Sequence, residues 1–218
     1  KDSPSHGLPH DWTVPGNLVR QAWGDGLCNR KSGNRFSGKL HGGKTVRLMV
    51  HRMTGQYPEI WFVRHGETDW NKDRRIQGQT DIELNQTGHA QAQAIAQALR
   101  AQLASLEHLG IHVSPLKRPR QTLSHILDAF GPQPVEPRVE DRLIELNFGE
   151  AEGKTWPELN QLGIDPEADP AGYHAWRPQG GESYADATAR VQAWLDSLSG
   201  PALAVAHGGI SRIVRGLV

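Results

Sequence analysis

Cysteine is almost absent from this chain, which excludes two kinds of structural site. Cys28 is the single cysteine among 218 residues, so neither an internal disulfide nor a zinc–thiolate cluster can form. That scarcity fits a reducing compartment. Long hydrophobic runs are also missing, since no stretch approaches the roughly 20 apolar residues of a membrane span. The N-terminus lacks the charged and then apolar layout of a secretory signal, so we expect a soluble, cytoplasmic protein with no membrane partner.

An excess of one charge is missing as well, because 24 Lys and Arg balance 24 Asp and Glu. The charges are unevenly spread, so that residues 1–59 are basic and residues 60–218 are mildly acidic. A mildly acidic main body gives no support for nucleic acid as a partner. With 37% hydrophobic residues, the chain has the composition of a polar globular protein that can form one core.

Residues 1–59 differ from the rest of the chain. They are rich in Gly, Ser, Pro, Asn and basic residues, and they sustain no helical periodicity. Only Val46, Leu48 and Val50 alternate as the residues of a strand would. We interpret this region as a poorly ordered extension, or as an added leader that is foreign to the domain.

One stretch of this region matches the phosphate-binding pattern G-x-x-x-x-G-K-[ST], namely Gly38 to Thr45. A phosphate-binding loop must lie between a buried strand and a helix. Here the residues before it, Arg30 to Ser37, are polar, and Val46 to Val50 alternate with a period of two. The context therefore disfavours a nucleotide-binding loop.

From Ile60 onward, short apolar runs alternate with segments of helical periodicity. The apolar runs predict strands, and the segments with a stripe at 3.6-residue spacing predict helices. We expect strands at 60–63, 111–113, 135–139 and 202–206, and helices at 86–106, 118–130, 157–162, 183–198 and after 209. Strands that alternate with helices imply an α/β fold, a three-layer sandwich with a mostly parallel central sheet flanked by helices.

Three of the predicted strands end in residues suited to binding an anion. They are followed by Arg64-His65-Gly66, by Ser114-Pro115-Leu-Lys-Arg118 and by His207-Gly208-Gly209. The carboxyl ends of parallel strands open on the same edge of a sheet, so these side chains should meet in one pocket. Glycines at the start of a helix leave backbone N–H groups free to face an anion.

The chain resembles the histidine phosphatase superfamily, the phosphoglycerate-mutase-like group, in five ordered blocks over residues 60–218. These blocks are Arg64-His65-Gly66-Glu67-Thr68 with Asn71; Ser114-Pro115-x-x-Arg118 with Gln121-Thr122; Leu143-x-Glu145-x-x-Phe148-Gly149-x-x-Glu152-Gly153; Gly180-Gly181-Glu182-Ser183; and His207-Gly208-Gly209.

The resemblance implies a metal-independent phosphomonoester hydrolase that needs no cofactor. His65 would be the nucleophile that forms a phosphohistidine, and Glu145 would be the proton donor. Arg64 and Arg118 would stabilise the phosphoryl group, and His207 would complete the cation set in its protonated form. The resemblance also suggests a phosphate- or substrate-binding set of Asn71, Gln77, Gly78, Gly208 and Gly209. No histidine pair has the spacing of metal ligands, so we expect no metal site.

Several other residues are better explained by structure than by chemistry. Glu67 and Thr68 are expected to tie down the loop after His65. Glu182 and Ser183 have the pattern of a helix N-cap. The tryptophans in this region could line a substrate mouth, although packing is the more common role of an isolated tryptophan; they are Trp70, Trp156 and Trp176.

Three functions remain open, of which we favour the phosphatase. In glycolytic mutases a basic pair follows the proton-donating glutamate, and a longer basic insertion comes after it. Here Leu146 and Asn147 follow Glu145, with only Lys154 and Arg177 as candidate cations at the rim. The pattern is closer to the small phosphatases of the α-ribazole phosphatase and broad-specificity type. The alternatives are a cofactor-dependent phosphoglycerate mutase and an inactive member that binds a phosphorylated ligand.

The expected substrate is a small phosphorylated metabolite. The chain ends at Val218 inside the last predicted helix, so we expect the domain at 60–218 to be truncated at its C-terminus. The sequence leaves the oligomeric state open, with a homodimer as one alternative.

Overall fold

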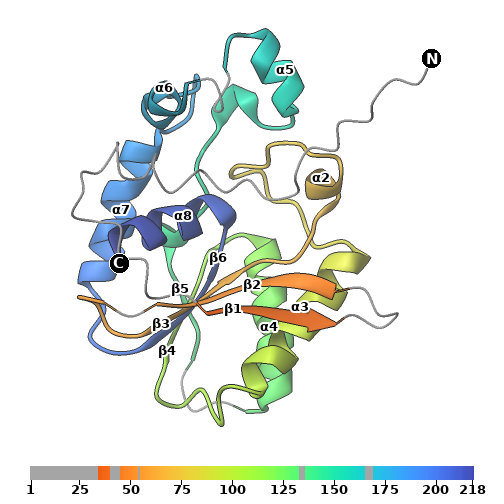
Figure 1. Cartoon of the computed structure of the whole chain (residues 1–218), viewed down its shortest axis with the longest axis vertical. Helices are drawn as coiled ribbons and strands as arrows, with labels where there is room; N and C mark the ends of the chain where they lie inside the picture. The colour runs from red at the N-terminus through yellow and green to blue at the C-terminus, as the bar shows by residue number, and fades with distance from the viewer. Residues whose placement is uncertain (1–33, 40–44, 54, 133–135, 165–168) are drawn as a thin grey trace.

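A six-stranded sheet forms the centre of the molecule, in the order β1-β2-β3-β6-β4-β5 (Figure 1). The computed structural model describes residues 34–39, 45–53, 55–132, 136–164 and 169–218. The strands are β1 (Asn34–Lys39), β2 (Thr45–Met53), β3 (Ile60–Arg64), β4 (Gly110–Val113), β5 (Arg138–Val139) and β6 (Ala202–Ala206). β3, β6, β4 and β5 run parallel, whereas β1 and β2 are antiparallel to their neighbours.

The helices connect these strands and cover both faces of the sheet (Figure 1). They are α2 (Asp69–Lys72), α3 (Gln86–Arg100), α4 (Lys117–Phe130), α5 (Trp156–Gln161), α6 (Pro170–Ala175), α7 (Tyr184–Asp196) and α8 (Gly208–Leu217), with short 3-10 helices η1 (Asp141–Leu143) and η2 (Gly149–Ala151). Among the residues that the structure describes, no helix combines the length and the apolar character needed to cross a membrane.

Alternate residues of β3 pack on opposite faces of the sheet. Trp61 and Val63 join a core with α3 and α4, while Ile60 and Phe62 join a second core with α7 and α8. β3 and β6 are buried on both faces, which is why each is a continuous apolar run rather than an alternating one. Full burial of such a side chain contributes roughly 1.5–3 kcal/mol. The predicted three-layer α/β fold is therefore confirmed.

The interpretation of residues 1–59 as a poorly ordered extension is wrong for two stretches. Asn34–Lys39 and Thr45–Met53 are strands, and β2 pairs with β3 from Val50↔Val63 to Met53↔Ile60. Met53 is buried in the core on the α7 and α8 side. The alternation of Val46, Leu48 and Val50 was the visible signal, but strand formation depends on pairing with β3, which lies beyond the reach of a local pattern. Residues 1–33 lie outside the described residues.

The phosphate-loop pattern at Gly38 to Thr45 joins two antiparallel strands. β1 ends at Lys39, and β2 begins at Thr45, so a strand follows the pattern where a phosphate-binding loop needs a helix; residues 40–44 lie outside the described part. A strand in place of the required helix removes the backbone arrangement that binds phosphate in such loops. The sequence-based rejection of a nucleotide-binding loop is consistent with this topology.

The other predicted elements are present with shifted ends. The first long helix ends at Arg100 rather than at residue 106, and the strand predicted at 135–139 is reduced to Arg138–Val139. The region 140–180 was expected to hold one short helix near 157–162. It contains α5 there, and also α6, which the sequence pattern did not reveal.

The loop after β3 lies directly against the first turn of α3. A Cβ atom at Gly88 would lie 2.0 Å from the carbonyl oxygen of Glu67, and one at Gly66 would lie 2.3 Å from the carbonyl oxygen of Gly88. Asn85 caps α3 by accepting a hydrogen bond from the Gly88 N–H at 2.8 Å. These contacts fix the position of the loop after His65 relative to α3.

We expect Gly88→Ala to destabilise the fold by roughly 1–3 kcal/mol, because the new methyl group would overlap backbone atoms that cannot move independently. An alanine in an open helical position would instead favour the fold by up to about 1 kcal/mol. Gly216→Ala in α8 is the matched control, since a Cβ there has nothing within 4 Å. Urea unfolding of both variants measures the difference, and equal stability would contradict the close contact.

Candidate active site

The carboxyl ends of β3, β6 and β4 lie next to one another, as the sequence predicted. Arg64 is paired with Ala206 in the parallel register, and the His65 N–H donates to the Ala206 carbonyl at 3.0 Å. The Ser114 N–H donates to the Val205 carbonyl at 3.1 Å. The rings of His65 and His207 consequently approach to 5.2 Å between centroids, with an interplanar angle of 65°.

The His65 ring is held as a neutral imidazole. Its Nδ1 lies 2.7 Å from the carbonyl oxygen of Gly66, and because a carbonyl only accepts, Nδ1 carries the ring proton. Nε2 therefore keeps its lone pair. Burial, followed by the charges of Arg118 and Arg64, holds the pKa of His65 well below its usual value, so the ring is neutral near pH 7.

His207 begins α8 and is completely buried. Its Nε2 lies 2.7 Å from Ser114 Oγ, which can donate to it, and in that tautomer Nδ1 carries the proton. Burial and the charge of Arg118 lower the pKa of His207 well below its usual value, with smaller contributions from His65 and Arg64. Burial and nearby charge therefore favour a neutral His207 in the absence of a bound anion, whereas the protonated ring was expected opposite a phosphate.

The two predicted arginines are held differently. Arg118 is fully buried, and its Nη1 and Nη2 donate to the carbonyl oxygens of Thr80 and Gly78 at 2.8 and 2.7 Å. Arg64 lies against the start of α8, where a Cβ at Gly208 would be 3.3 Å from its Nε. Burial lowers the pKa of both guanidinium groups, but from so high a value that each stays charged.

Three buried nitrogens of these residues have no hydrogen-bond partner: Arg64 Nε, Arg118 Nε and His207 Nδ1. Buried polar groups without partners are rare in folded proteins, because each costs about 1–3 kcal/mol. Two cationic donors and an imidazole nitrogen left unpaired around one histidine suit an anion that has several acceptor oxygens. The chemistry of the donor set therefore matches a phosphate group.

Glu145 lies beside the N-terminus of α8. Its Oε2 accepts from the Gly209 N–H at 3.2 Å, and its Oε1 accepts from the Leu146 N–H at 3.1 Å. A Cβ at Gly209 would lie 2.5 Å from Glu145 Oε1, so a larger residue there would displace the carboxyl group from this position. The charge of Glu145 raises the pKa of both Arg64 and Arg118, which places the carboxylate within electrostatic reach of the two cations.

Asn71, Gln77 and Gly78 lie in the loop system that supports the site. Thr68 is fully buried and donates to the Gln77 side-chain oxygen at 2.8 Å. It also caps α2 in a reciprocal arrangement with Asn71. Gly78 has a φ of 53° and binds Arg118 through its carbonyl, while a Cβ there would overlap Glu152. The amide oxygens of Asn71 and Gln77 are thus engaged, which leaves their NH2 groups as the donors for a ligand.

The structural roles expected for neighbouring residues are present. Glu67 binds Asn85 and Gln91, which ties the loop after His65 to α3. Ser183 caps α7 in a reciprocal arrangement with Asp186. Glu182 is not a cap, because its carboxylate pairs with Arg190 at 2.8 Å.

The tryptophans and rim cations named from the sequence are engaged in packing or pairing. Trp176 stacks on Tyr173 at 5.7 Å between ring centroids, and Trp156 meets the same tyrosine edge-on at 5.7 Å. Arg177 pairs with Asp186 at 2.5 Å, and Lys154 donates to the Glu150 carbonyl. Both cations thus have partners within the protein in this structure.

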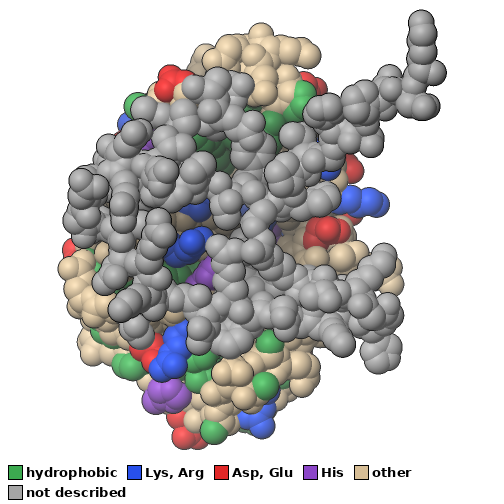
Figure 2. Space-filling model, in the orientation of Figure 1, with side chains coloured by type: hydrophobic (Ala, Val, Ile, Leu, Met, Phe, Trp, Pro, Cys, Tyr) green, Lys and Arg blue, Asp and Glu red, His purple; other side chains and the backbone are tan. Residues whose placement is uncertain are grey.

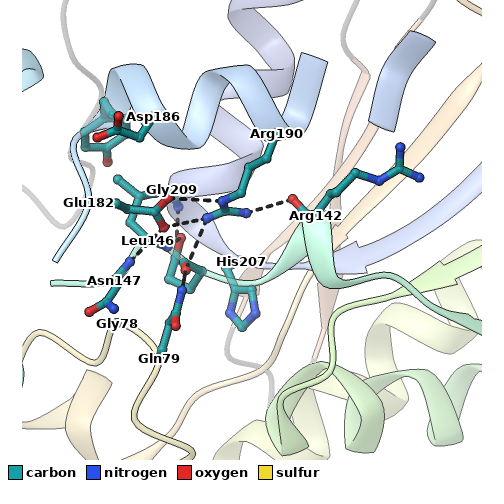
Figure 3. Close-up of polar contacts among 12 residues, drawn as sticks. Gly78, Gln79, Arg142, Leu146, Asn147, Glu182, Asp186, Arg190, His207 and Gly209 are labelled. Atoms are coloured by element: carbon teal, nitrogen blue, oxygen red, sulfur yellow. Dashed lines mark hydrogen bonds and ion pairs between the residues drawn. The ribbon is translucent and has the colours of Figure 1, made fainter. Parts of the chain in front are cut away.

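Sequence reasoning did not assign roles to two residues that organise the site. Thr122 Oγ1 accepts from the Gly66 N–H at 3.2 Å and donates to the Arg118 carbonyl at 2.9 Å, so it links the loop after β3 to the start of α4. Arg190 donates to backbone carbonyls near Glu145 (Figure 3). Thr122 lay inside a quoted motif and could have been singled out, whereas Arg190 had no local signal.

The described residues contain no group of three or more His, Cys, Asp or Glu side chains arranged to hold a metal ion.

On the face seen in Figure 2, acidic and basic side chains of the described residues are interspersed.

We expect both site imidazoles to stay neutral well below the pH at which histidines in the unfolded chain take up protons, about 6.5. As the pH falls below that value, the unfolded chain binds protons on His65 and His207 while the folded protein does not, so the free energy of unfolding falls. Each unit of pKa difference corresponds to about 1.4 kcal/mol. An NMR titration of ¹⁵N-labelled imidazoles, assigned with His65→Asn and His207→Asn, measures both values; titration at or above 6.5 would contradict the burial argument.

Comparisons with known proteins agree with this geometry. Residues 60–217 match the model of the histidine phosphatase superfamily (branch 1). The chain is 36% identical to phosphoglycerate mutase-like protein 4 of Arabidopsis thaliana, over 72% of this chain and 69% of that one. It is 33% identical to a metal-independent phosphoserine phosphatase of the same plant, over 75% of this chain and 69% of that one.

A solved structure supports the same conclusion. The mycobacterial glucosyl-3-phosphoglycerate phosphatase in complex with VO3 superimposes with a TM-score of 0.59 at 31% identity, covering 70% of this chain and 77% of that one. Family match, sequence similarity and fold all coincide over the region that carries His65, Arg118, Glu145 and His207. The chain therefore belongs to the histidine phosphatase superfamily.

Proposed function

We propose that this protein hydrolyses phosphomonoesters through a phosphohistidine formed on His65. The observation that carries this proposal is the set of buried, unpartnered nitrogens on Arg64, Arg118 and His207 around a neutral imidazole with a free Nε2. A phosphoryl group transferred to nitrogen spreads its negative charge over three oxygens, so catalysis consists mainly of positioning and charge stabilisation.

In the first step, the Nε2 lone pair of His65 attacks phosphorus, and the bond from phosphorus to the ester oxygen breaks. Glu145, in its protonated form, gives its proton to the departing oxygen, which leaves as an alcohol. The guanidinium groups of Arg64 and Arg118 bind the phosphoryl oxygens, and His207 Nδ1–H donates to one of them. Burial is the largest cause of the lowered pKa of His207, and the charges of Arg118 and Arg64 add to it; a phosphate dianion offsets those charges, which favours protonation of His207 in the complex.

In the second step, water attacks the phosphohistidine and the bond from phosphorus to nitrogen breaks. Glu145, now a carboxylate, accepts a proton from the water, which regenerates both the acid and the free imidazole. Neutral donors complete the phosphate site in this proposal: the NH2 groups of Asn71 and Gln77, the backbone around Gly78 and the first amides of α8, at Gly208 and Gly209.

The substrate we propose is a small phosphorylated metabolite. Relatives named as a metal-independent phosphoserine phosphatase and a glucosyl-3-phosphoglycerate phosphatase support a phosphatase. A subtype near the α-ribazole and broad-specificity phosphatases is supported by Leu146 and Asn147, which stand where the mutases carry cations. We also propose a cytoplasmic location, without a metal, a cofactor, nucleic acid or membrane in the reaction, on the basis of the single cysteine and the acidic main body.

A mutase is the second candidate, because one relative is named phosphoglycerate mutase-like protein 4. A mutase must hold a bisphosphorylated intermediate and exclude water, which requires additional cations near the transferred group. The candidates for that task are engaged elsewhere, since Arg177 pairs with Asp186 and Lys154 binds a backbone carbonyl. These contacts favour hydrolysis.

We expect the wild-type protein to hydrolyse p-nitrophenyl phosphate in the presence of a chelator and to acquire an acid-labile, base-stable ³²P label from a labelled phosphomonoester. His65→Ala should remove both the label and at least about 10³-fold of the activity, because the covalent step has no other nucleophile. His108→Ala, which alters an exposed histidine near Glu59 at the opposite end of β3, should retain the label. Folded wild-type protein without turnover would contradict the proposal and support the ligand-binding alternative.

The choice between phosphatase and mutase makes a separate prediction. With 3-phosphoglycerate, in the presence and absence of 2,3-bisphosphoglycerate, we expect phosphate release to exceed formation of 2-phosphoglycerate by at least about tenfold, because no second cation set retains the phosphorylated intermediate. Coupled enolase and phosphate assays measure the two products side by side. Isomerisation that outpaces phosphate release would overturn the choice of a phosphatase.

A further inference from the structure

The backbone segment that carries Glu145 is held by three polar side chains from other parts of the fold (Figure 3). The Glu145 carbonyl accepts from Gln79 Nε2 at 3.0 Å and from Arg190 Nη2 at 3.3 Å. Arg190 Nη1 donates to the Arg142 carbonyl at 2.7 Å. The guanidinium group of Arg190, in α7, thus binds the carbonyls of Arg142 and Glu145, which are three residues apart in the same segment.

Glu182 fixes the orientation of that guanidinium group. Its two carboxylate oxygens accept from Arg190 Nη2 at 2.8 Å and from Arg190 Nε at 3.2 Å, which is a two-point contact. Glu182 also binds the Asn147 backbone at both groups, accepting from its N–H at 3.0 Å and donating its own N–H to its carbonyl at 2.8 Å. The pair therefore grips the segment before and after Glu145.

The segment around Glu145 is also held by contacts other than those of Arg190 and Glu182. Leu143 and Leu146 flank Glu145 and are buried at 0% and 1% exposure against α7 and α8. These two side chains anchor the segment to the core by apolar contact. The polar contacts act on the backbone at Arg142, Glu145 and Asn147, between the anchors and on both sides of them, and there they orient the peptide at residue 145 and its carboxyl group.

We propose that Arg190 and Glu182 are positioning residues for the proton donor Glu145, an inference that rests on the proposed function of that residue. The Glu145 carboxyl must meet the ester oxygen at hydrogen-bond distance as the bond to phosphorus breaks. A displacement of about 1 Å in such a group can cost about 100-fold in rate. Arg190, oriented by Glu182, holds the backbone of Glu145 in place, while Gly209 at the start of α8 leaves room for its carboxyl group.

The leaving group offers a test that loss of structure would not imitate. A p-nitrophenolate ion leaves without a proton, whereas the alkoxide of glycerol 3-phosphate needs one, so a misplaced acid affects only the alkyl ester. We expect Arg190→Gln to lower kcat/KM for glycerol 3-phosphate by about 10- to 100-fold and for p-nitrophenyl phosphate by less than about threefold. kcat/KM is the quantity to compare because it excludes the later hydrolysis of the phosphohistidine.

Two conservative variants keep the test decisive if Arg190→Gln fails to fold. Arg190→Lys retains the charge but not the fork, so it should show the same selective loss. Glu182→Gln retains an acceptor oxygen for Asn147 and Arg190, and it should show a smaller loss in the same direction. Thermal denaturation followed by circular dichroism establishes that each variant is folded.

Arg142→Gln is the matched control, because Arg142 makes an equally well-defined contact with the same helix. It pairs with Glu140 at 2.7 Å and donates to the Ala193 carbonyl at 2.8 Å, without a side-chain contact to Glu145. We expect this variant to treat the two esters alike. Equal losses on both esters in the Arg190 variants, or no loss on the alkyl ester, would overturn the positioning role.

Glu145→Gln separates failure of this inference from failure of the proposed function. It should lower kcat/KM for the alkyl ester by roughly 10²- to 10⁴-fold while sparing the aryl ester. If Glu145→Gln shows this selectivity and the Arg190 variants do not, the positioning role is wrong and the proton donor stands. If Glu145→Gln shows no selectivity, Glu145 is not the proton donor, and the inference fails with it.

Discussion

The parallel pairing of β3 with β6 is the constraint on which the site depends. Five consecutive residue pairs, from Ile60↔Ala202 to Arg64↔Ala206, place the ends of the two strands side by side. A shift of one residue would turn the alternating side chains of β3 to the wrong faces of the sheet and would separate the two histidines along the strand direction. Burial on both faces prevents that shift, so the same apolar contacts that stabilise the sheet determine the distance between the imidazoles.

Electrostatics at these strand ends is a balance between burial and charge. Two guanidinium groups lie beside two imidazoles, and desolvation is the largest cause of the lowered pKa of each of the four groups. Nearby like charge adds to that effect at both histidines. Burying these cationic groups side by side destabilises the folded protein, and a bound anion would offset their charge. The arrangement that lowers stability therefore also favours binding of a phosphoryl group.

The loops around the sheet are held by side chains that contact backbone rather than substrate. Arg118 binds the carbonyls of Thr80 and Gly78, and Glu152 binds the N–H groups of Gln79 and Thr80 from the opposite side. Gln79 then reaches the carbonyl of Glu145. The loop at residues 78–80 and the segment of Glu145 are thereby connected, so that Arg118 and Glu145 are placed relative to one another and not only relative to the sheet.

Local sequence patterns predicted many of the strands of this protein, the residues at their ends and the helix caps. Apolar runs that end in Arg64-His65, Ser114 and His207 indicate both the strands and the chemistry at their ends, because strand period and chain direction are local properties. The capping of α7 by Ser183 and the structural role of Thr68 follow from short spacings in the same way.

Only the tertiary structure decided the remaining features. β1 and β2 joined the sheet because β3 offered an edge, and a weak alternation over Val46 to Val50 could not reveal that partner. The lowered pKa of His207 comes first from its burial and then from Arg118, which lies 89 residues earlier in the sequence, and the backbone of Glu145 is held by Arg190, which lies in α7. Long-range charge, burial and backbone contacts arise only when distant segments meet, so no window of sequence contains the information that determines them.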